Sequence, residues 1–365
     1  MVREKAHRGD GLNLTIATTA VLRDGEPRPE IVKVPKAMLY TGTPTEGSSM
    51  TARWLAALLI FAASTAACAE YPTRPIRIIA PSTPGGVADT FARLLAEFLP
   101  PLLHQPVIVD NRPGAGGLIG AAAAARAEPD GYTLVTASIA YHVIAPAVSP
   151  NPPFDPIRDF TYVAFLGGPP NTFVADPALR VKSVKQLIAL ARGGRPLNYV
   201  SPGVGTLGNL LFEYFAQKAA IAVQHIPHKG SSQAMMDLIA GNVMIGSMTW
   251  SSAVGQIRAG MVVPIAVSSG ARVAEFPDVP TLQEQGFDDL VAMTWHALAG
   301  PSGLPEDVAH KLNDAVNAAW ATPALRQRLA DDAIIAEPMS PEAVTEFVTG
   351  EVRKWGPVAR RVMSP

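Results

Sequence analysis

The sequence predicts an α/β protein built from two domains, and three observations support this prediction. The chain has 365 residues, which is enough for two domains of ordinary size. Its composition is 48% hydrophobic and 17% charged, which is typical of a globular protein with a sizeable core. The same order of elements, a strand followed by a Gly/Pro/Ser turn and an amphipathic helix, occurs in both halves of the chain.

Residues 50–69 have the layered pattern of a secretory signal peptide. A short positive region ending at Arg53 precedes an apolar stretch, and residues 67–69 fit the small-x-small cleavage pattern. The stretch is too short for a membrane span, which needs about 20 apolar residues. Two alternatives remain open, a buried helix and lipoprotein processing at Cys68, although the usual large aliphatic residue upstream of that cysteine is missing. We therefore expect an exported protein.

Residues 1–49 precede the predicted signal peptide and show no sustained periodicity. Because a signal peptide stands at the start of a chain, we interpret them as a non-native leader or a misassigned start, with translation beginning at Met50. Without residues 1–69, the mature chain has a net charge of −3 and no cysteine, which excludes disulfides and thiol nucleophiles. It contains no block of like charges, so we expect no nucleic-acid partner.

The first half of the mature chain opens with a strand, a turn and a helix. Residues 76–80 form a short apolar strand candidate and residues 81–86 a Pro/Gly turn. A helix is predicted next because apolar residues recur at helical spacing, at Phe91, Leu94, Leu95, Phe98 and Leu99. The order then continues with a strand at 107–109, a turn at 113–117, an alanine-rich helix ending near Ala127 and a strand at 133–136.

The second half repeats this order. A strand at 197–200 and a turn at 201–205 precede a helix with apolar residues at Leu207, Leu210, Leu211, Tyr214 and Phe215. The later candidates are a strand at 223–226, a turn at 227–230, a helix bearing Met235, Leu238 and Ile239, and strands at 243–246 and 265–268. This alternation predicts a mostly parallel sheet with right-handed crossovers.

The C-terminal stretch is predicted to be helical. Pro305 suits a first helical position, and an apolar stripe follows at Val308, Leu312, Ala315 and Val316. Ser340 and Pro341 are typical of the N-cap and first position of a last helix, which carries Phe347, Val348 and Trp355. We interpret both stripes as core.

Two turns at helix starts are candidate anion sites. A helix N-terminus exposes unpaired N–H groups and partial positive charge, and glycines let an anion approach the backbone. The candidate residues in the first turn are Ser82, Thr83, Gly85, Gly86, Val87, Ala88 and Asp89. Those in the second are Ser201, Gly203, Val204, Gly205 and Thr206. A third helix start, at residues 230–232, is a further candidate, and ordinary strand–helix turns are the alternative for each.

Catalytic and cofactor interpretations have less support. Residues 203–208 form a G-x-G-x-x-G pattern after a strand, but no acid stands about 20 residues later to bind a ribose. No nucleophile elbow and no H-E-x-x-H motif occur. His225 and His228 lack further metal ligands, and Asp89 is more simply a group that orders its own loop or binds a ligand. We therefore expect no catalytic residue, cofactor or metal.

An ordered set of motifs then carries a family resemblance. It comprises residues 71–76, residues 84–86 with Asp89, residues 111–117, residues 129–134, Asp155 with residues 159–160, residues 225–230 and residues 277–281. Together these motifs resemble the substrate-binding receptors of tripartite tricarboxylate transporters, the Bug/TctC family, from about Tyr71 to the C-terminus.

The resemblance implies a two-domain periplasmic binding protein of type II, a "Venus flytrap" with two hinge crossovers. It implies a first domain of residues 70–172 plus 297–365 and a second of residues 173–296. It further implies a small organic carboxylate held between them, largely by backbone groups and water, and delivery to membrane permease subunits. A third contact stretch is carried over to residues 225–231, which adds His225, His228, Lys229, Gly230 and Ser231 to the candidates.

Four positions depart from the family pattern. The family usually has an aromatic residue at Ser82, a His at Asn209, a Tyr at His228 and often an Asp at Met248. We hypothesise that the missing acid at Met248 disfavours an amino-bearing ligand, and that Ser82 and His228 make the pocket more polar. We expect a monomeric periplasmic solute-binding protein that is not an enzyme. A receptor without a permease and a periplasmic enzyme acting on small carboxylates are the alternatives.

Overall fold

The computed structural model describes residues 20–23, 26–29, 70–194, 196–331 and 333–363. The chain divides into two compact units, Met1–Cys68 and Ala69–Pro365. In the first unit, β1 (Ala20–Arg23) and β2 (Glu26–Pro29) pair as an antiparallel hairpin inside the predicted leader. The predicted signal peptide and Cys68 lie outside the described residues, so both stay predictions.

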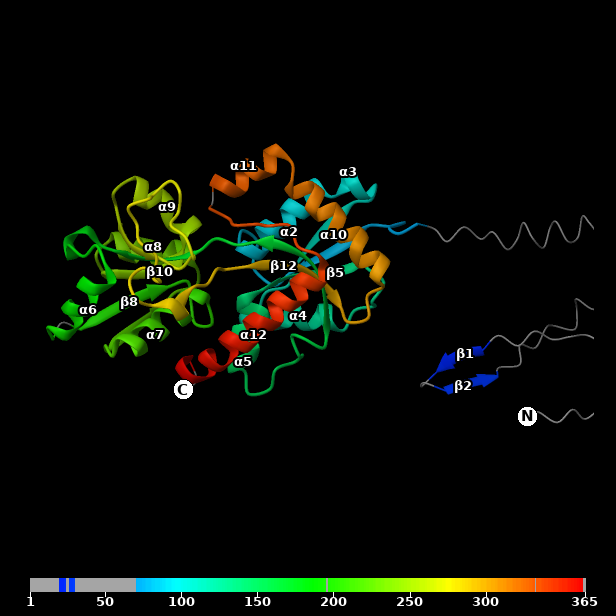
Figure 1. Ribbon diagram of the computed structural model, residues 1–365, viewed down its shortest axis with the longest axis horizontal. Helices are drawn as coiled ribbons and strands as arrows, with labels where there is room; N and C mark the ends of the chain where they lie inside the picture. Colours follow the sequence, from blue (N-terminus) through cyan, green and yellow to red (C-terminus); the bar gives the residue numbers. More distant parts are fainter. Residues whose placement is uncertain (1–19, 24–25, 30–69, 195, 332, 364–365) are drawn as a thin grey trace, which may run out of the picture. The chain divides into compact units, whose positions relative to one another are not determined.

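The second unit contains two five-stranded sheets in separate lobes (Figure 1). The first sheet has the order β4-β3-β5-β12-β6. β3 pairs in parallel with β4 and β5, whereas β12 runs antiparallel to β5 and β6. Its strands are β3 (Ile76–Ala80), β4 (Val107–Asn111), β5 (Thr133–Ser138), β6 (Phe160–Gly167) and β12 (His296–Pro301).

The second sheet has the order β11-β7-β10-β8-β9. β8 pairs in parallel with β9 and β10, and β7 runs antiparallel to β10 and β11. Its strands are β7 (Asn171–Ala175), β8 (Leu197–Ser201), β9 (Val223–Pro227), β10 (Ile245–Thr249) and β11 (Val263–Val267). Each sheet therefore has a parallel half and an antiparallel half.

The prediction of a mostly parallel sheet was wrong for the antiparallel halves. β6, β7 and β12 were not predicted, because their residues are buried almost without interruption and show no alternation. The strand expected at 243–246 runs from Ile245 to Thr249, because the turn after α8 continues to Val243, whose N–H bonds to Asp237. α10 begins at Glu306, with Pro305 as its N-cap rather than its first residue.

Helices surround both sheets (Figure 1). In the first lobe they are α2 (Val87–Phe98), α3 (Pro100–Leu103), α4 (Leu118–Ala125), α5 (Ala145–Val148), α10 (Glu306–Trp320), α11 (Pro323–Asp331) and α12 (Pro341–Met363). In the second they are α6 (Val184–Arg192), α7 (Leu207–Ala219), α8 (Ser231–Ile239) and α9 (Trp250–Arg258). A π-helical turn, Ala140–Ile144, follows β5. The predicted apolar stripe of α10 is buried in the core of the first lobe.

Two chain segments cross between the sheets, one after β6 and one before β12. They approach so closely that a Cβ added to Gly168 would lie 2.4 Å from the carbonyl oxygen of Thr294. Gly167 has a φ of +91°, and a Cβ there would meet Ala336 at 2.6 Å. Glycine is therefore required at both positions of the first crossover.

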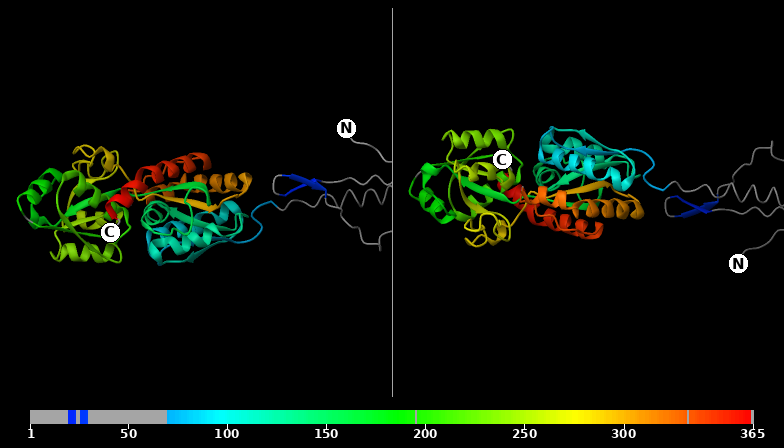
Figure 2. Two further views of the ribbon diagram at one scale, coloured as in Figure 1. Left: turned by 90° about the horizontal axis from the view of Figure 1, so that it is seen from below. Right: turned by 90° about the horizontal axis from the view of Figure 1, so that it is seen from above.

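The last helix touches both lobes. α12 packs along β6 and also contacts α7, where Trp355 meets the ring of Tyr214 edge-on with centroids 6.3 Å apart. Figure 2 shows its C-terminal end reaching the second lobe. Within residues 70–194, 196–331 and 333–363, no helix has the length and apolar character needed to cross a membrane.

Candidate ligand-binding cleft

A cavity of about 460 Å³ lies between the two sheets. Nine of the candidate ligand residues line it: Ser82, Thr83, Gly85, Gly86, Val87, Thr206, Lys229, Gly230 and Ser231. Eight others do not: Ala88, Asp89, Ser201, Gly203, Val204, Gly205, His225 and His228. The two sequence-predicted turns and the third helix start thus meet at one cavity, although many of their residues serve other purposes.

Four helices begin at this cavity. Lining residues include Val87 of α2, Leu207 of α7, Ser231 of α8 and, at the α9 N-cap, Thr249. Within the described residues, no side chain caps the first N–H groups of α2, α8 or α9. Free N–H groups and helix dipoles at one place favour a bound anion.

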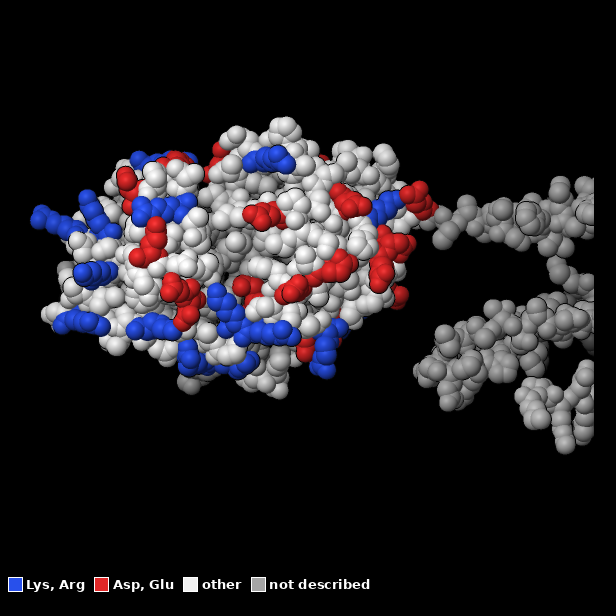
Figure 3. Space-filling model, viewed as in Figure 1, with Lys and Arg blue, Asp and Glu red and all other residues white. Residues whose placement is uncertain are grey.

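The cavity carries little side-chain charge. Of the described residues that line it, Lys229 is the one with a full positive charge, and none is Asp or Glu. On the face shown in Figure 3, by contrast, basic side chains gather over the lobe with α6 and acidic ones over the lobe with α10. The wall of the cavity is therefore electropositive, whereas the surface around it carries both signs.

Asp89 orders the first turn rather than facing the cavity. Its carboxylate is buried and accepts hydrogen bonds from the backbone N–H of Gly85 at 2.8 Å, Arg93 Nε at 2.8 Å and Asn111 Nδ2 at 2.9 Å. Burial alone would raise the pKa of Asp89, but these three donors outweigh it and hold the pKa below its usual range. The prediction that Asp89 contacts the ligand directly has no support in this geometry.

His225 has a comparable role in the second turn. Its Nδ1 accepts from Asn209 Nδ2 at 3.3 Å, so Nε2 carries the proton and donates to Ser201 Oγ at 2.7 Å. Ser201 Oγ in turn donates to the carbonyl of Gly203 at 3.2 Å. Burial lowers the pKa of His225 to about 4, which keeps the ring neutral. This chain of bonds fixes the turn before α7.

Two of the expected departures from the family pattern act differently from the hypothesis. Met248 is fully buried in the apolar core of the second lobe, so its side chain does not line the cavity. Nε2 of His228 lies 3.1 Å from Oδ2 of Asp237, outside the cavity lining and without hydrogen-bond geometry. Ser82, in contrast, does line the cavity.

Several lining residues were missed by the sequence analysis. They are Ser138, Ala140, Tyr141, Asn171, Leu207, Gly208, Thr249, Ser252, Thr294 and His296. Most stand at the ends of β5, β10 and β12 and at the two crossovers, where only the sheet topology brings them together. Pro84, Pro202 and Ser232 also line the cavity, and they lie within the two turns and the third helix start that the sequence did suggest.

Polar groups of the first lobe face the cavity without partners. Ser82 Oγ and Thr294 Oγ1 are enclosed atoms that have no hydrogen-bond partner in the described chain. The ring of Tyr141 packs against Gly117, where an added Cβ would lie 2.2 Å from it. Burial raises the pKa of Tyr141 to about 12, so its phenol stays protonated. Buried unpaired hydroxyls are uncommon in proteins, which favours a bound ligand or water as their partner.

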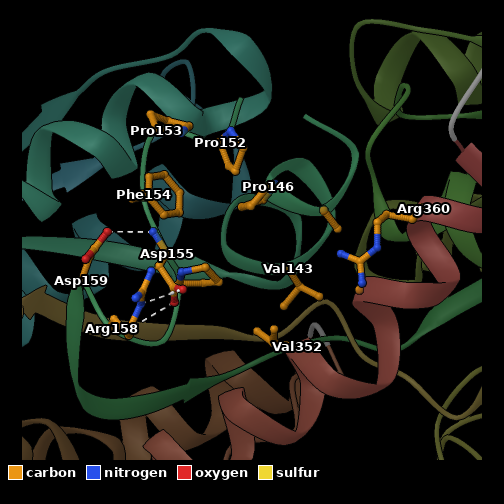
Figure 4. Close-up of a pocket in the computed structure, with 13 residues that line it drawn as sticks. Val143, Pro146, Pro152, Pro153, Phe154, Asp155, Arg158, Asp159, Val352 and Arg360 are labelled. Atoms are coloured by element: carbon orange, nitrogen blue, oxygen red, sulfur yellow. Dashed lines mark hydrogen bonds and ion pairs between the residues drawn. The ribbon is translucent and has the colours of Figure 1, made fainter. Parts of the chain in front are cut away.

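A second cavity, of about 450 Å³, lies outside the cleft between the 152–159 loop and α12 (Figure 4). Its wall contains Asp155, which accepts from the N–H groups of Ile157 and Arg158 and from Arg158 Nε. Asp159 accepts from the N–H of Asp155. Both acids therefore hold the loop together, and with Arg158 and Arg360 the lining carries two acidic and two basic side chains. The described residues contain no group of three or more His, Cys, Asp or Glu placed to hold a metal.

The chain is similar to known receptors over most of its length. Residues 91–363 match the model of the tripartite tricarboxylate transporter family receptor. BugT of Bordetella pertussis is 34% identical over 316 residues, which cover 84% of this chain and 97% of BugT. A protein in the TAR-I ttuE-ttuC' intergenic region of Agrobacterium vitis is 33% identical, with 84% of this chain and 90% of that protein covered.

Solved structures with the same fold include two with bound acids. A protein of R. palustris solved with adipate is 29% identical, with a TM-score of 0.73 over 81% of this chain and all of that one. MatC from Rhodopseudomonas palustris with bound malate is 28% identical, with a TM-score of 0.71 over 79% and 100%. The periplasmic binding protein BugD is 29% identical, with a TM-score of 0.70 over 81% and 100%.

These matches confirm the resemblance and the predicted fold class. The fold is that of a periplasmic binding protein of the TctC/Bug type, with two mixed α/β sheets. The chain therefore belongs to the receptor family of the tripartite tricarboxylate transporters.

Proposed function

We propose that this protein is a periplasmic solute-binding protein that captures a small organic carboxylate in the cleft and catalyses no reaction. The observation that carries the proposal is the cavity lining, in which Lys229 and four helix starts face the same space and no described lining residue is acidic. The adipate and malate bound by two related proteins support a carboxylate as the ligand class.

Binding would act through closure of the two domains predicted at residues 70–172 plus 297–365 and residues 173–296, with bounds moved by the sheets: β7 puts Asn171 in the second lobe, and β12 puts His296 in the first. The lining residues come from both sheets, so a ligand that touches both walls stabilises the closed form by its differential affinity. Gly168 places the first crossover directly against the second, which suits a hinge.

A thermal-shift screen followed by calorimetric titration tests the proposal. Mono-, di- and tricarboxylates, aromatic acids and amino acids would be added to the purified protein. A ligand at about 100 times its dissociation constant adds about 2.7 kcal/mol to the free energy of unfolding, a shift of a few degrees. We expect a carboxylate to bind without being converted. Turnover of the acid would instead support the enzyme alternative.

Export and delivery are further parts of the proposal. Residues 50–69 would direct the chain to the periplasm, and N-terminal sequencing of the precursor and mature forms should place their starts at Met50 and near residue 70. The closed form would then dock on a tripartite tricarboxylate-type permease. Deleting the gene should lower cellular uptake of the titrated acid, whereas unchanged uptake would favour a receptor without a permease.

A further inference from the structure

His296 lies at the start of β12, in the first-lobe wall of the cleft. The residue lines the cavity and is only 2% exposed. Its ring stacks on Phe91, with centroids 4.8 Å apart and planes 27° apart. The packing fixes the ring, so the atom that His296 presents to a ligand is set by the fold.

The proton of this ring can be assigned from one contact. Nδ1 lies 3.2 Å from the carbonyl oxygen of Thr294, and because a carbonyl oxygen only accepts, Nδ1 carries the hydrogen. Burial lowers the pKa of His296 to about 4, so the ring is neutral. Nε2 is then a hydrogen-bond acceptor, and no described residue donates to it.

A ligand that offers only carboxylates cannot satisfy this acceptor. Carboxylate oxygens accept hydrogen bonds, so they suit Lys229, the helix starts and the unpaired hydroxyls of Ser82 and Thr294. An acceptor at His296 that loses water on closure without gaining a donor weakens binding. A ligand that brings a hydrogen-bond donor as well as a carboxylate satisfies this acceptor directly, without a bridging water.

A hydroxyl fits this requirement better than an ammonium group. An ammonium group would enter a wall that has no described acidic residue, close to Lys229 and four positive helix ends. A hydroxyl donates to Nε2 of His296 and carries no charge. Its oxygen can also accept from the hydroxyl of Ser82 or Thr294.

We propose that the cleft selects hydroxycarboxylates, with the ligand hydroxyl donating to Nε2 of His296 and the carboxylate held by Lys229 and the helix starts. His296 is thus a specificity-determining residue. This inference rests on the proposed carboxylate-binding function and adds the hydroxyl group to it.

Calorimetric titration with matched pairs of acids tests the inference. The pairs are propionate and lactate, succinate and malate, and glutarate and 2-hydroxyglutarate, with aspartate as the amino counterpart of malate. In the best-binding pair we expect the hydroxy acid to bind about tenfold or more tightly than its parent, and malate to bind more tightly than aspartate. Equal affinities within the best-binding pair, or preferred binding of aspartate, would overturn the inference and leave carboxylate binding intact.

A failure of the proposed function would give a different experimental result, namely no binding of any acid. If neither these acids nor any acid of the wider carboxylate screen binds, the carboxylate function itself is wrong and the inference falls with it. The wild-type comparison needs no variant, so it remains decisive if a substitution at the buried His296 impairs folding.

His296→Phe assigns the effect to the imidazole. Phe keeps a ring against Phe91 but removes the acceptor, so the preference for the hydroxy acid should fall to about twofold or less while the parent acid binds as before. His310→Phe, at an exposed histidine of α10, is the matched control and should keep the wild-type ratio. An unchanged ratio in His296→Phe would show that another group recognises the hydroxyl.

Discussion

The first-lobe and second-lobe walls of the cleft carry different chemistry. The second-lobe wall contains Lys229 and the starts of α7, α8 and α9, which all favour negative charge. The first-lobe wall has the start of α2 as its anion-favouring feature and, with the adjoining crossover, adds neutral polar groups, namely Ser82, Tyr141, Thr294 and His296. The second-lobe wall therefore has the larger share of the groups that suit anion capture, and the first-lobe wall has most of the neutral groups that suit recognition of the rest of the ligand. Substitutions on each wall should separate affinity from selectivity.

The largest effect is expected at Lys229. Lys229→Glu removes the ammonium group and adds a negative charge, so carboxylate affinity should fall by more than a hundredfold, and Lys229→Gln should cost about 1.5–3 kcal/mol of binding free energy. Lys182→Gln, at an exposed lysine outside the cavity lining, is the control. Titration of the three variants with the best acid makes the comparison. Wild-type affinity in Lys229→Glu would place the carboxylate elsewhere.

The next largest effect concerns acid stability behind the first wall. His142 is fully buried near Phe154, Phe160 and Tyr162, and burial, with a smaller contribution from His296, lowers its pKa to about 3. Below about pH 6.5 both histidines are therefore protonated in the unfolded chain, whereas in the folded chain His142 and His296 stay neutral. The free energy of unfolding should have its full value above about pH 6.5. On acidification below that pH it should fall by about 1.4 kcal/mol per pH unit for each histidine.

His142→Phe isolates one of these protons. Urea unfolding at several pH values between 4.5 and 7 gives the free energy of unfolding as a function of pH. Its slope should be smaller in the variant by the contribution of one proton, which amounts to about 2–3 kcal/mol over two pH units. Carboxylates contribute equally to both proteins and cancel in the comparison. Ligand affinity at pH 7 should be unchanged, because His142 does not line the cavity. An identical slope in both proteins would contradict the assignment of a buried neutral His142.

A smaller effect is expected from the loop that forms the edge of the first wall. Asp89→Asn removes the charge that accepts from Gly85, Arg93 and Asn111, and should lower the free energy of unfolding by about 1–3 kcal/mol. Because the pKa of Asp89 is depressed, its contribution is present above about pH 4 and is lost as the pH falls through the folded value. Chemical unfolding at pH 7 and pH 3 should show a larger difference at pH 7. Equal differences would assign the effect to packing instead.

The smallest effect is expected at the unpaired hydroxyls. Ser82→Ala removes a hydroxyl that has no hydrogen-bond partner in the described chain, so the free energy of unfolding should change by no more than about 0.5 kcal/mol. Ligand affinity should fall a few-fold, since a hydroxyl that contacts the ligand is lost. Thr294→Val gives the same comparison on the crossover. A clear loss of stability without a change in affinity would show that these hydroxyls serve the fold.

The sequence predicted the helix starts on both walls better than the strand ends and crossovers beside them. The starts of α7 and α8 are marked locally by Gly/Pro/Ser turns before amphipathic helices, so Thr206, Gly230 and Ser231 could be found. His296 begins an antiparallel strand whose buried residues show no alternation, and Thr294 lies in the crossover just before it. Ser138 ends β5, and Tyr141 lies within the unmarked π-helical turn that follows. Their approach to the first turn depends on strand order, which no local pattern encodes.

Local pattern also could not separate ligand contacts from groups that hold the turns. Asp89 and His225 stand beside glycine-rich turns just as a ligand-binding residue would. Only the hydrogen bonds to Gly85, Arg93 and Asn111, and from His225 to Ser201, show that they order those turns. Periodicity alone predicted two α/β halves, and the family resemblance predicted that they form a two-lobed binding protein.

A crystal structure of the protein with its best-binding hydroxy acid tests the account most directly. We predict a carboxylate within hydrogen-bonding distance of Lys229 Nζ and the N–H groups at the start of α8, with the ligand hydroxyl next to Nε2 of His296. An acid bound in the Figure 4 cavity, or one in the cleft with its carboxylate against the first-lobe wall and away from Lys229, would contradict the division between the two walls.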